Sequence, residues 1–204
     1  MRGTTYLLAA AFAVGILRAL PWAAAAESVT VAASGEAALP VVVASGSGQR
    51  VRIAAAELAE YLGRIGNAEF KVEESDGKRG LAVGVFTDFP ALELAGRFDP
   101  ADIARREEYL LRSHAHGVHV IGATETAVEH AVWDLLHRLG YRQFFPTATW
   151  EVVPRLDTVT ISVDVIEKPD FYNRSAPRGA GRTVDREAWQ RWHRRNRMTP
   201  AFTL

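Results

Sequence analysis

The chain of 204 residues contains no cysteine and carries no excess charge of either sign. Without cysteine, a disulfide scaffold and a thiolate site are both excluded. Because 24 Lys and Arg residues balance 24 Asp and Glu residues, no overall field favours nucleic acid or an anionic membrane as a partner. The sequence also lacks the GxSxG elbow, the GxxxxGK[ST] phosphate loop and the HExxH helix. Any function must therefore come from local features.

What is present is enough apolar sequence for a folded core. The chain is 48% apolar, and a chain of this length and composition can bury a core of its own. Length favours one main domain with an appendage.

The first 26 residues have the pattern of a secretory signal peptide. Arg2 precedes an apolar run at residues 6–17, and the small-residue tract 23–26 precedes Glu27. We expect cleavage after Ala26 and a secreted or periplasmic protein; an uncleaved membrane anchor is the alternative. The run is short for a membrane span and Arg18 ends it. Cleavage removes two arginines, so the mature chain has 22 basic and 24 acidic residues, a net charge of −2.

Two stretches have the apolar spacing of amphipathic helices. In the first, residues 51–65, we expect Gly66 to end the helix. In the second, Thr126 and Glu129 predict a capping box and Gly140 a left-handed end. The apolar positions are Leu58, Tyr61, Leu62 and Ile65 in the first helix, and Val128, Ala131, Val132, Leu135, Leu136 and Leu139 in the second.

The remaining apolar runs predict short strands. The run at residues 81–86 is continuous, which is typical of a central strand buried on both faces. Gly117 marks a hairpin turn, and residues 87–106 predict a long excursion with a helical turn or two. The fold class is therefore α/β or α+β, a mixed β-sheet with two main amphipathic helices packed on it. The predicted strands are residues 29–32, 39–44, 70–73, 81–86, 109–113, 118–121, 141–146, 150–154 and 158–163.

The C-terminal stretch differs in character from the rest. Residues 172–204 hold eight arginines against only Asp185 and Glu187, and we expect a helix at 185–197 carrying Trp189 and Trp192. The organisation is a signal peptide at 1–26, an α/β domain at 27–170 and a basic tail at 171–204. An exported protein rarely meets nucleic acid, so we expect no such partner for the tail.

Histidine clusters offer two candidate metal sites, and neither set is complete. His114, His116 and His119 gather at the hairpin, but no cysteine or well-placed carboxylate completes a shell, which favours solvated turn residues. His130, Asp134 and His137 share one helix face, opposite the leucine stripe, where we expect solvent. The pairs at residues 73–74 and 107–108 point apart and make no convincing acid and base. We expect no metal, no cofactor and no catalytic residue in this chain.

The best candidates for glycan contact follow the second helix. Arg142 lies among Tyr141, Phe144 and Phe145, where its guanidinium could bond a glycan oxygen or carboxylate. Trp150 could stack on a sugar. The alternative is that Arg142 binds backbone carbonyls at the helix exit and that Trp150 packs, and this structural interpretation is favoured.

Several motifs in one order resemble the amino-terminal domain of α-glucuronidases. They are AAAEL at 54–58, YL at 61–62, IG at 65–66, VG at 83–84, VIG at 120–122, LLHRLGYRQFFP at 135–146, WEVVP at 150–154 and EKPDF at 167–171. A similar domain precedes the barrel in β-hexosaminidases and in many secreted bacterial proteins. The resemblance runs from Val29 to Arg174. It departs at residues 123–126, where an arginine–glycine pair would be expected; this leaves the fold intact but argues against a substrate contact from that loop.

The resemblance implies a non-catalytic domain beside a (β/α)8 barrel that does the hydrolysis. Residues 171–174 would then begin the first barrel strand, the tail helix would belong to the barrel's start, and the chain would be a fragment of a longer protein. The leading hypothesis is an exported accessory domain that supports this downstream barrel and contributes one rim of a glycan cleft. The alternatives are a free-standing module that binds oligosaccharide or polysaccharide, and a surface protein that docks another chain through Trp189 and Trp192.

Overall fold

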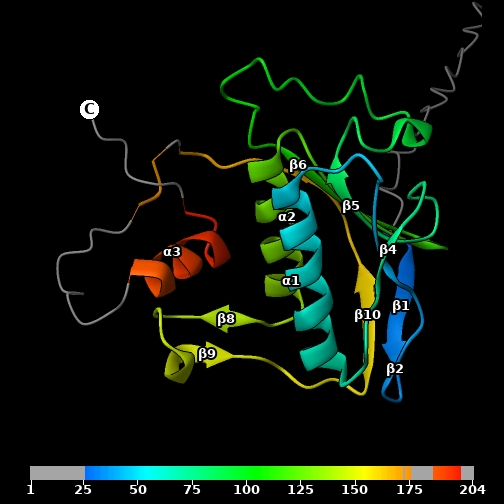
Figure 1. Ribbon diagram of the computed structural model, residues 1–204, viewed down its shortest axis with the longest axis vertical. Helices are drawn as coiled ribbons and strands as arrows, with labels where there is room; N and C mark the ends of the chain where they lie inside the picture. Colours follow the sequence, from blue (N-terminus) through cyan, green and yellow to red (C-terminus); the bar gives the residue numbers. More distant parts are fainter. Residues whose placement is uncertain (1–25, 172, 176–185, 199–204) are drawn as a thin grey trace, which may run out of the picture.

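A computed structural model of the chain describes residues 26–171, 173–175 and 186–198. The predicted signal peptide lies almost wholly outside the described residues. Two long helices, α1 (Gln49–Gly66) and α2 (Glu125–Arg138), pack side by side in the middle of the molecule (Figure 1). They cover one face of a six-stranded mixed sheet. The predicted fold class, a mixed sheet with two main helices, is confirmed.

The six strands are arranged in the order β11-β6-β7-β5-β3-β4. Parallel pairing joins β4, β3, β5 and β7, and antiparallel pairing joins β7, β6 and β11. The predicted hairpin around Gly117 is β6–β7, and β5 is central as its continuous apolar run predicts. The strand bounds are β3 (Val41–Val43), β4 (Val72–Glu74), β5 (Gly80–Val85), β6 (Tyr109–His114), β7 (Gly117–Gly122) and β11 (Asp164–Glu167).

Smaller sheets and turns complete the described part. A three-stranded antiparallel sheet, β10-β1-β2, packs against α1, and a two-stranded ribbon, β8–β9, follows α2. The excursion predicted at residues 87–106 contains one 3₁₀ turn, η1 (Pro90–Leu92). The remaining bounds are β1 (Ser28–Ala33), β2 (Glu36–Ala37), β8 (Arg142–Gln143), η2 (Ala148–Trp150), β9 (Glu151–Val152), β10 (Thr158–Ser162) and α3 (Arg186–Arg195).

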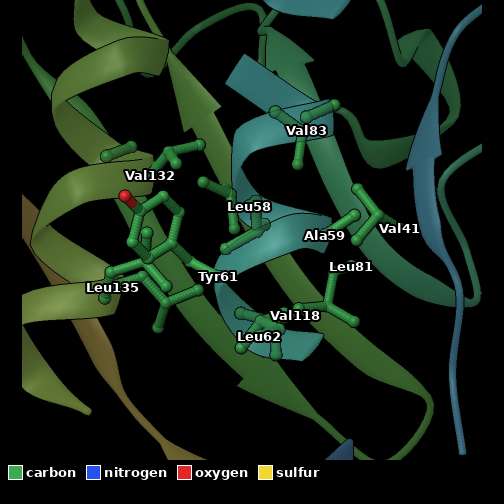
Figure 2. Packing of buried hydrophobic residues seen from close by; sticks show 14 of the residues in the cluster. Val41, Leu58, Ala59, Tyr61, Leu62, Leu81, Val83, Val118, Val132 and Leu135 are labelled. Atoms are coloured by element: carbon green, nitrogen blue, oxygen red, sulfur yellow. The ribbon is translucent and has the colours of Figure 1, made fainter. Parts of the chain in front are cut away.

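Alternation along the strands gives the sheet two buried faces. The helix-facing side chains of the sheet meet Leu58, Tyr61 and Leu62 of α1 and Val132 and Leu135 of α2 (Figure 2). They include Val41 of β3, Leu81 and Val83 of β5, and Val118 of β7. The alternate residues Val42, Ala82 and Ile121 face the other way, under Phe89, Leu94 and Phe98 of the excursion. The excursion therefore acts as a cover for the second face of the sheet.

Two helix boundaries differ from the sequence prediction. The N-cap of α2 is Thr124, whose hydroxyl accepts from the Ala127 amide at 3.3 Å; Thr126 lies inside the helix, and Glu129 binds Arg50 instead of closing a capping box. At the end of α1 it is Asn67, with φ 50°, that adopts the left-handed conformation.

Gly66 is the last residue of α1 rather than its stop signal. A Cβ added there would come within 2.9 Å of Val159 Cγ2 and 3.3 Å of Ala32 Cβ. The glycine is required because the helix end presses against β1 and β10, not because of its backbone angles. Gly140 has φ 99° and follows α2 as predicted.

The tail helix is confirmed as α3, and none of the described residues 171 and 173–175 is in a strand. Among the described residues, none of the helices is long and apolar enough to cross a membrane.

Candidate functional site

The four predicted glycan-contact residues lie around the β8–β9 ribbon, but only three reach the surface. Phe144 is 64% exposed and Trp150 is 54% exposed, while Tyr141 is completely buried. Arg142 is exposed, and its Nη1 donates to the carbonyl oxygens of His137 at 2.5 Å and Tyr141 at 2.6 Å. These are the backbone contacts at the helix exit that the structural interpretation of Arg142 predicts. Whether the exposed residues bind a glycan stays a prediction.

The polar centre of this region is Glu151, which sequence reasoning did not single out. Its Oε1 accepts hydrogen bonds from Tyr61 (2.6 Å), Tyr141 (3.1 Å) and Arg195 (3.0 Å), and its Oε2 accepts one from Arg64 (2.8 Å). Two donors come from α1, one from Tyr141 just before β8, and one from α3. Only the carboxylate's position after a tryptophan in the ribbon could have drawn attention to it.

The electrostatics of this cluster favour a fixed carboxylate. Burial raises the pKa of Glu151, but hydrogen bonds from Arg64 and Tyr61 outweigh burial and hold the pKa below its usual value. Burial, together with the hydrogen bond to Glu151, raises the pKa of Tyr61 to about 12. Burial is also the main reason that the pKa of Tyr141 is raised. The carboxylate thus stays ionised between permanent donors, which suits an anchor better than an acid or base.

A pocket of about 450 Å³ opens beside this cluster. It lies between the β8–β9 ribbon and α3, with Gln143, Thr147, Glu151, Arg191 and Arg195 among its lining residues. Amide, hydroxyl and guanidinium groups of this kind can bond the hydroxyls or carboxylate of a small polar ligand. This pocket, with exposed Trp150 next to Glu151 in the chain, is the candidate site.

The hairpin histidines form a ring pair rather than a complete metal shell. The ring centroids of His114 and His119 are 4.4 Å apart. Burial, with smaller effects from His114 and Arg112, lowers the pKa of His119 to about 4. Across residues 26–171, 173–175 and 186–198, no group of three His, Cys, Asp or Glu side chains is placed to hold a metal ion.

The prediction that His130, Asp134 and His137 face solvent is wrong for the first two, and His137 is half-buried. His130 is 4% exposed and Asp134 is 6% exposed. This face of α2 is covered because Arg174 and Arg197, from the end of the chain, reach over it: Arg197 Nη1 binds Asp134 Oδ1 at 2.7 Å, and Arg174 binds Glu107, which lies 3.5 Å from His130 Nδ1. Periodicity within one helix could not predict a cover supplied from sixty residues away.

The adjacent carboxylates at residues 107 and 108 point to different partners, as expected. Glu108 binds Arg105 at 2.7 Å, whereas Glu107 binds Arg174. Glu73 and Glu74 are both exposed on β4. Neither pair forms two facing carboxylates.

Comparison with known proteins gives only distant structural similarity. No protein-family model and no curated protein matches the sequence. Two structures of a GH20 exo-β-N-acetylglucosaminidase from Vibrio harveyi are similar to part of the chain: an inactive mutant (16% identity, TM-score 0.42, 74% of this chain and 18% of that one) and a complex with N-acetylglucosamine (17%, 0.41, 72% and 18%). A family GH115 4-O-methyl-α-glucuronidase with specificity for decorated arabinogalactans is also similar (18%, 0.45, 72% and 19%). The chain spans about a fifth of the length of each. Similarity this distant assigns the chain to no family.

Proposed function

We propose that the chain is a non-catalytic accessory domain of an exported carbohydrate-active protein, and that its role is to support neighbouring polypeptide. The observation that carries the proposal is the Glu151 cluster. Its carboxylate ties α1, the β8–β9 ribbon and α3 together through Tyr61, Arg64, Tyr141 and Arg195. A carboxylate held by four donors is suited to fixing elements in place.

The motifs that resemble α-glucuronidase amino-terminal domains support the same proposal. The stretch LLHRLGYRQFFP contributes the end of α2, strand β8 and the exposed Phe144, and WEVVP contributes Glu151. These motifs thus build the surface on which α3 rests. The downstream barrel, export and cleavage after Ala26 remain part of the proposal.

Hydrolysis assays test the accessory role. The purified chain is incubated with aryl glycosides and with glucuronoxylan, and released aglycone and reducing sugar are measured. We expect no release above the rate of buffer alone. Turnover that survives repurification, and is lost on Glu151→Gln but not on Glu60→Gln, would overturn the proposal. Mass spectrometry of the exported protein tests the predicted signal peptide, because the mature chain should begin at Glu27.

A second candidate function, a glycan-binding module, is favoured by the exposed aromatics and the pocket of about 450 Å³. Calorimetry with xylan and chitin oligosaccharides separates it from a purely supporting role. A binding module predicts a measurable Kd that Trp150→Ala weakens at least about fivefold, since stacking on one aromatic ring contributes on the order of 1 kcal/mol or more. Phe171→Ala, at a 73% exposed aromatic that does not belong to the β8–β9 region, is the matched control.

A further inference from the structure

The last described residues form an arm that packs on the rest of the chain. We call residues 171, 173–175 and 186–198 the arm and residues 26–170 the body. Helix α3 of the arm lies beside α2 and the β8–β9 ribbon (Figure 1). Trp192 is the large apolar side chain of α3 that is buried, at 9% exposure, and its Nε1 donates to the Gln143 carbonyl oxygen at 3.0 Å. Apolar contact by α3 therefore centres on Trp192, and half-buried Trp189 adds an edge contact with the Phe145 ring.

Ion pairs make up much of the remaining attachment. Four arginines of the arm each reach a carboxylate of the body, and the four carboxylates belong to different elements. Their side chains are only 8–17% exposed. The pairs are Arg174–Glu107, Arg194–Glu57 (3.7 Å), Arg195–Glu151 (3.0 Å) and Arg197–Asp134 (2.7 Å).

Three of these carboxylates have a second partner within the body. Asp134 also binds Arg138 at 2.9 Å, and Glu151 also binds Arg64 at 2.8 Å. Glu107 lies 3.5 Å from His130. Removing one partner of a buried ion pair is costly chiefly because the other charge is left uncompensated. Here the body already provides a replacement, so departure of the arm leaves none of these three without a neighbouring basic group.

Glu107 is shared between the arm and the body at a single oxygen. Its Oε2 contacts both Arg174 Nη2 and His130 Nδ1. A carboxylate 3.5 Å away would favour protonated His130, but Arg174 already neutralises it. Burial, followed by the charges of Arg174, Arg197 and Arg50, lowers the pKa of His130 to about 3. With the arm in place, His130 is therefore neutral.

We propose that the arm is a releasable clasp, in which Glu107 exchanges Arg174 for protonated His130 when the arm leaves the body. Proton uptake by His130 and release of the arm are then coupled, because protonated His130 is disfavoured beside Arg174 and Arg197 and favoured beside an unoccupied Glu107. Because release of the arm is accompanied by proton uptake, a more acidic medium favours release. Higher ionic strength acts in the same direction by screening the partly exposed pairs.

Other charged and titratable groups lie close to His130, Arg174 and Arg197. Asp134 and Tyr109 are also close to Arg197, and Arg50 is paired with Glu129. His137, on the same face of α2, has its pKa lowered to about 4 by burial and then by Arg197 and Arg142, so it adds to the response. The pocket beside His130 is also lined by Glu167, Lys168 and Asp170.

Hydrogen exchange of the whole chain measures the opening of the arm directly. Amide protection in α3 is compared with that in α1 at pH 7.5, 6.5 and 5.5, after correction for intrinsic rates. Unperturbed carboxylates stay ionised over this range. Uptake of one proton predicts that α3 protection falls by up to about tenfold between pH 6.5 and 5.5, while α1 protection stays constant. Raising the salt from 0.05 to 0.5 M should lower α3 protection further.

Two histidine variants distinguish the clasp from general acid sensitivity. His130→Gln should reduce the pH response of α3 to the part contributed by His137 and by His193 of α3, the pKa of which is also lowered by burial. His119→Gln should leave it unchanged, because His119 alternates with the helix-facing Val118 and Val120 and so points to the other face of the sheet. Arg174→Gln should lower α3 protection already at pH 7.5.

The proposal is overturned if α3 protection is independent of pH, if His130→Gln and His119→Gln respond alike, or if α1 loses protection in parallel with α3. The last result would mean that the body unfolds with the arm. Each result is independent of whether the chain binds or hydrolyses glycans.

Discussion

Gly117→Ala should destabilise the protein more than an alanine at most other glycines. A Cβ at residue 117 would lie 1.9 Å from the Gly80 carbonyl oxygen and within 3 Å of two further Gly80 backbone atoms. Ordinary van der Waals contact begins at 3.4 Å, so strands β5 and β7 must move apart by about 1.5 Å at this point. No rotamer change can relieve the contact, because the obstructing atoms are backbone.

The size of the expected loss in stability depends on where the two strands must separate. Gly80 and Gly117 pair at the start of β5 and β7, two central strands, and the Gly80 amide donates to His116 O at 3.0 Å. Overpacking of a well-packed interior costs about 1–3 kcal/mol, and an unsatisfied buried amide costs about 1–3 kcal/mol more. We expect Gly117→Ala to lower the free energy of unfolding by more than about 3 kcal/mol.

Two other glycines make a matched series. At Gly66 the obstructing atoms are the side chains of Val159 and Ala32, which can shift, so we expect a loss of about 1–2 kcal/mol. At Gly46 no atom lies within 4 Å of an added Cβ, so alanine should be neutral or stabilise by up to about 1 kcal/mol through the unfolded state.

Urea unfolding followed by circular dichroism measures all three variants. From most to least stable, the expected order is Gly46→Ala, then Gly66→Ala, then Gly117→Ala. A Gly117→Ala protein as stable as Gly66→Ala would refute the reasoning, since it would show that β5 and β7 separate at little cost.

Two further predictions use the same measurement. Thr124→Ala should destabilise by about 1 kcal/mol through loss of the helix cap, whereas Thr126→Ala should change stability by less than about 0.5 kcal/mol; equal effects would contradict the cap assignment. Because the pKa of His119 is lowered to about 4 in the folded protein, its contribution is fully present above pH 6.5 and is lost as the pH falls toward 4. At pH 5 the loss should be about 1 kcal/mol after allowance for partial exposure, and His119→Gln should remove that part of the pH dependence; an unchanged pH profile would contradict it.

Local patterns determined much of the architecture. The spacing of Leu58, Tyr61, Leu62 and Ile65 predicted the buried side of α1, because residues three and four apart share a helix face. The apolar run of β5 indicated a strand covered on both sides, and Gly117 indicated the hairpin. Such signals are readable because a helix or strand displays its own periodicity wherever it is placed.

The polar interior could not be predicted from local patterns. The burial of His130 and Asp134, the gathering of Tyr61, Tyr141, Arg64 and Arg195 around Glu151, and the ion pairs of the arm all join residues far apart in sequence. A polar side chain on a helix looks solvated until another segment covers it. Local sequence patterns set which faces are apolar, whereas the pairing of charged groups arises only in the folded chain, because such contacts depend on long-range packing that no local period encodes.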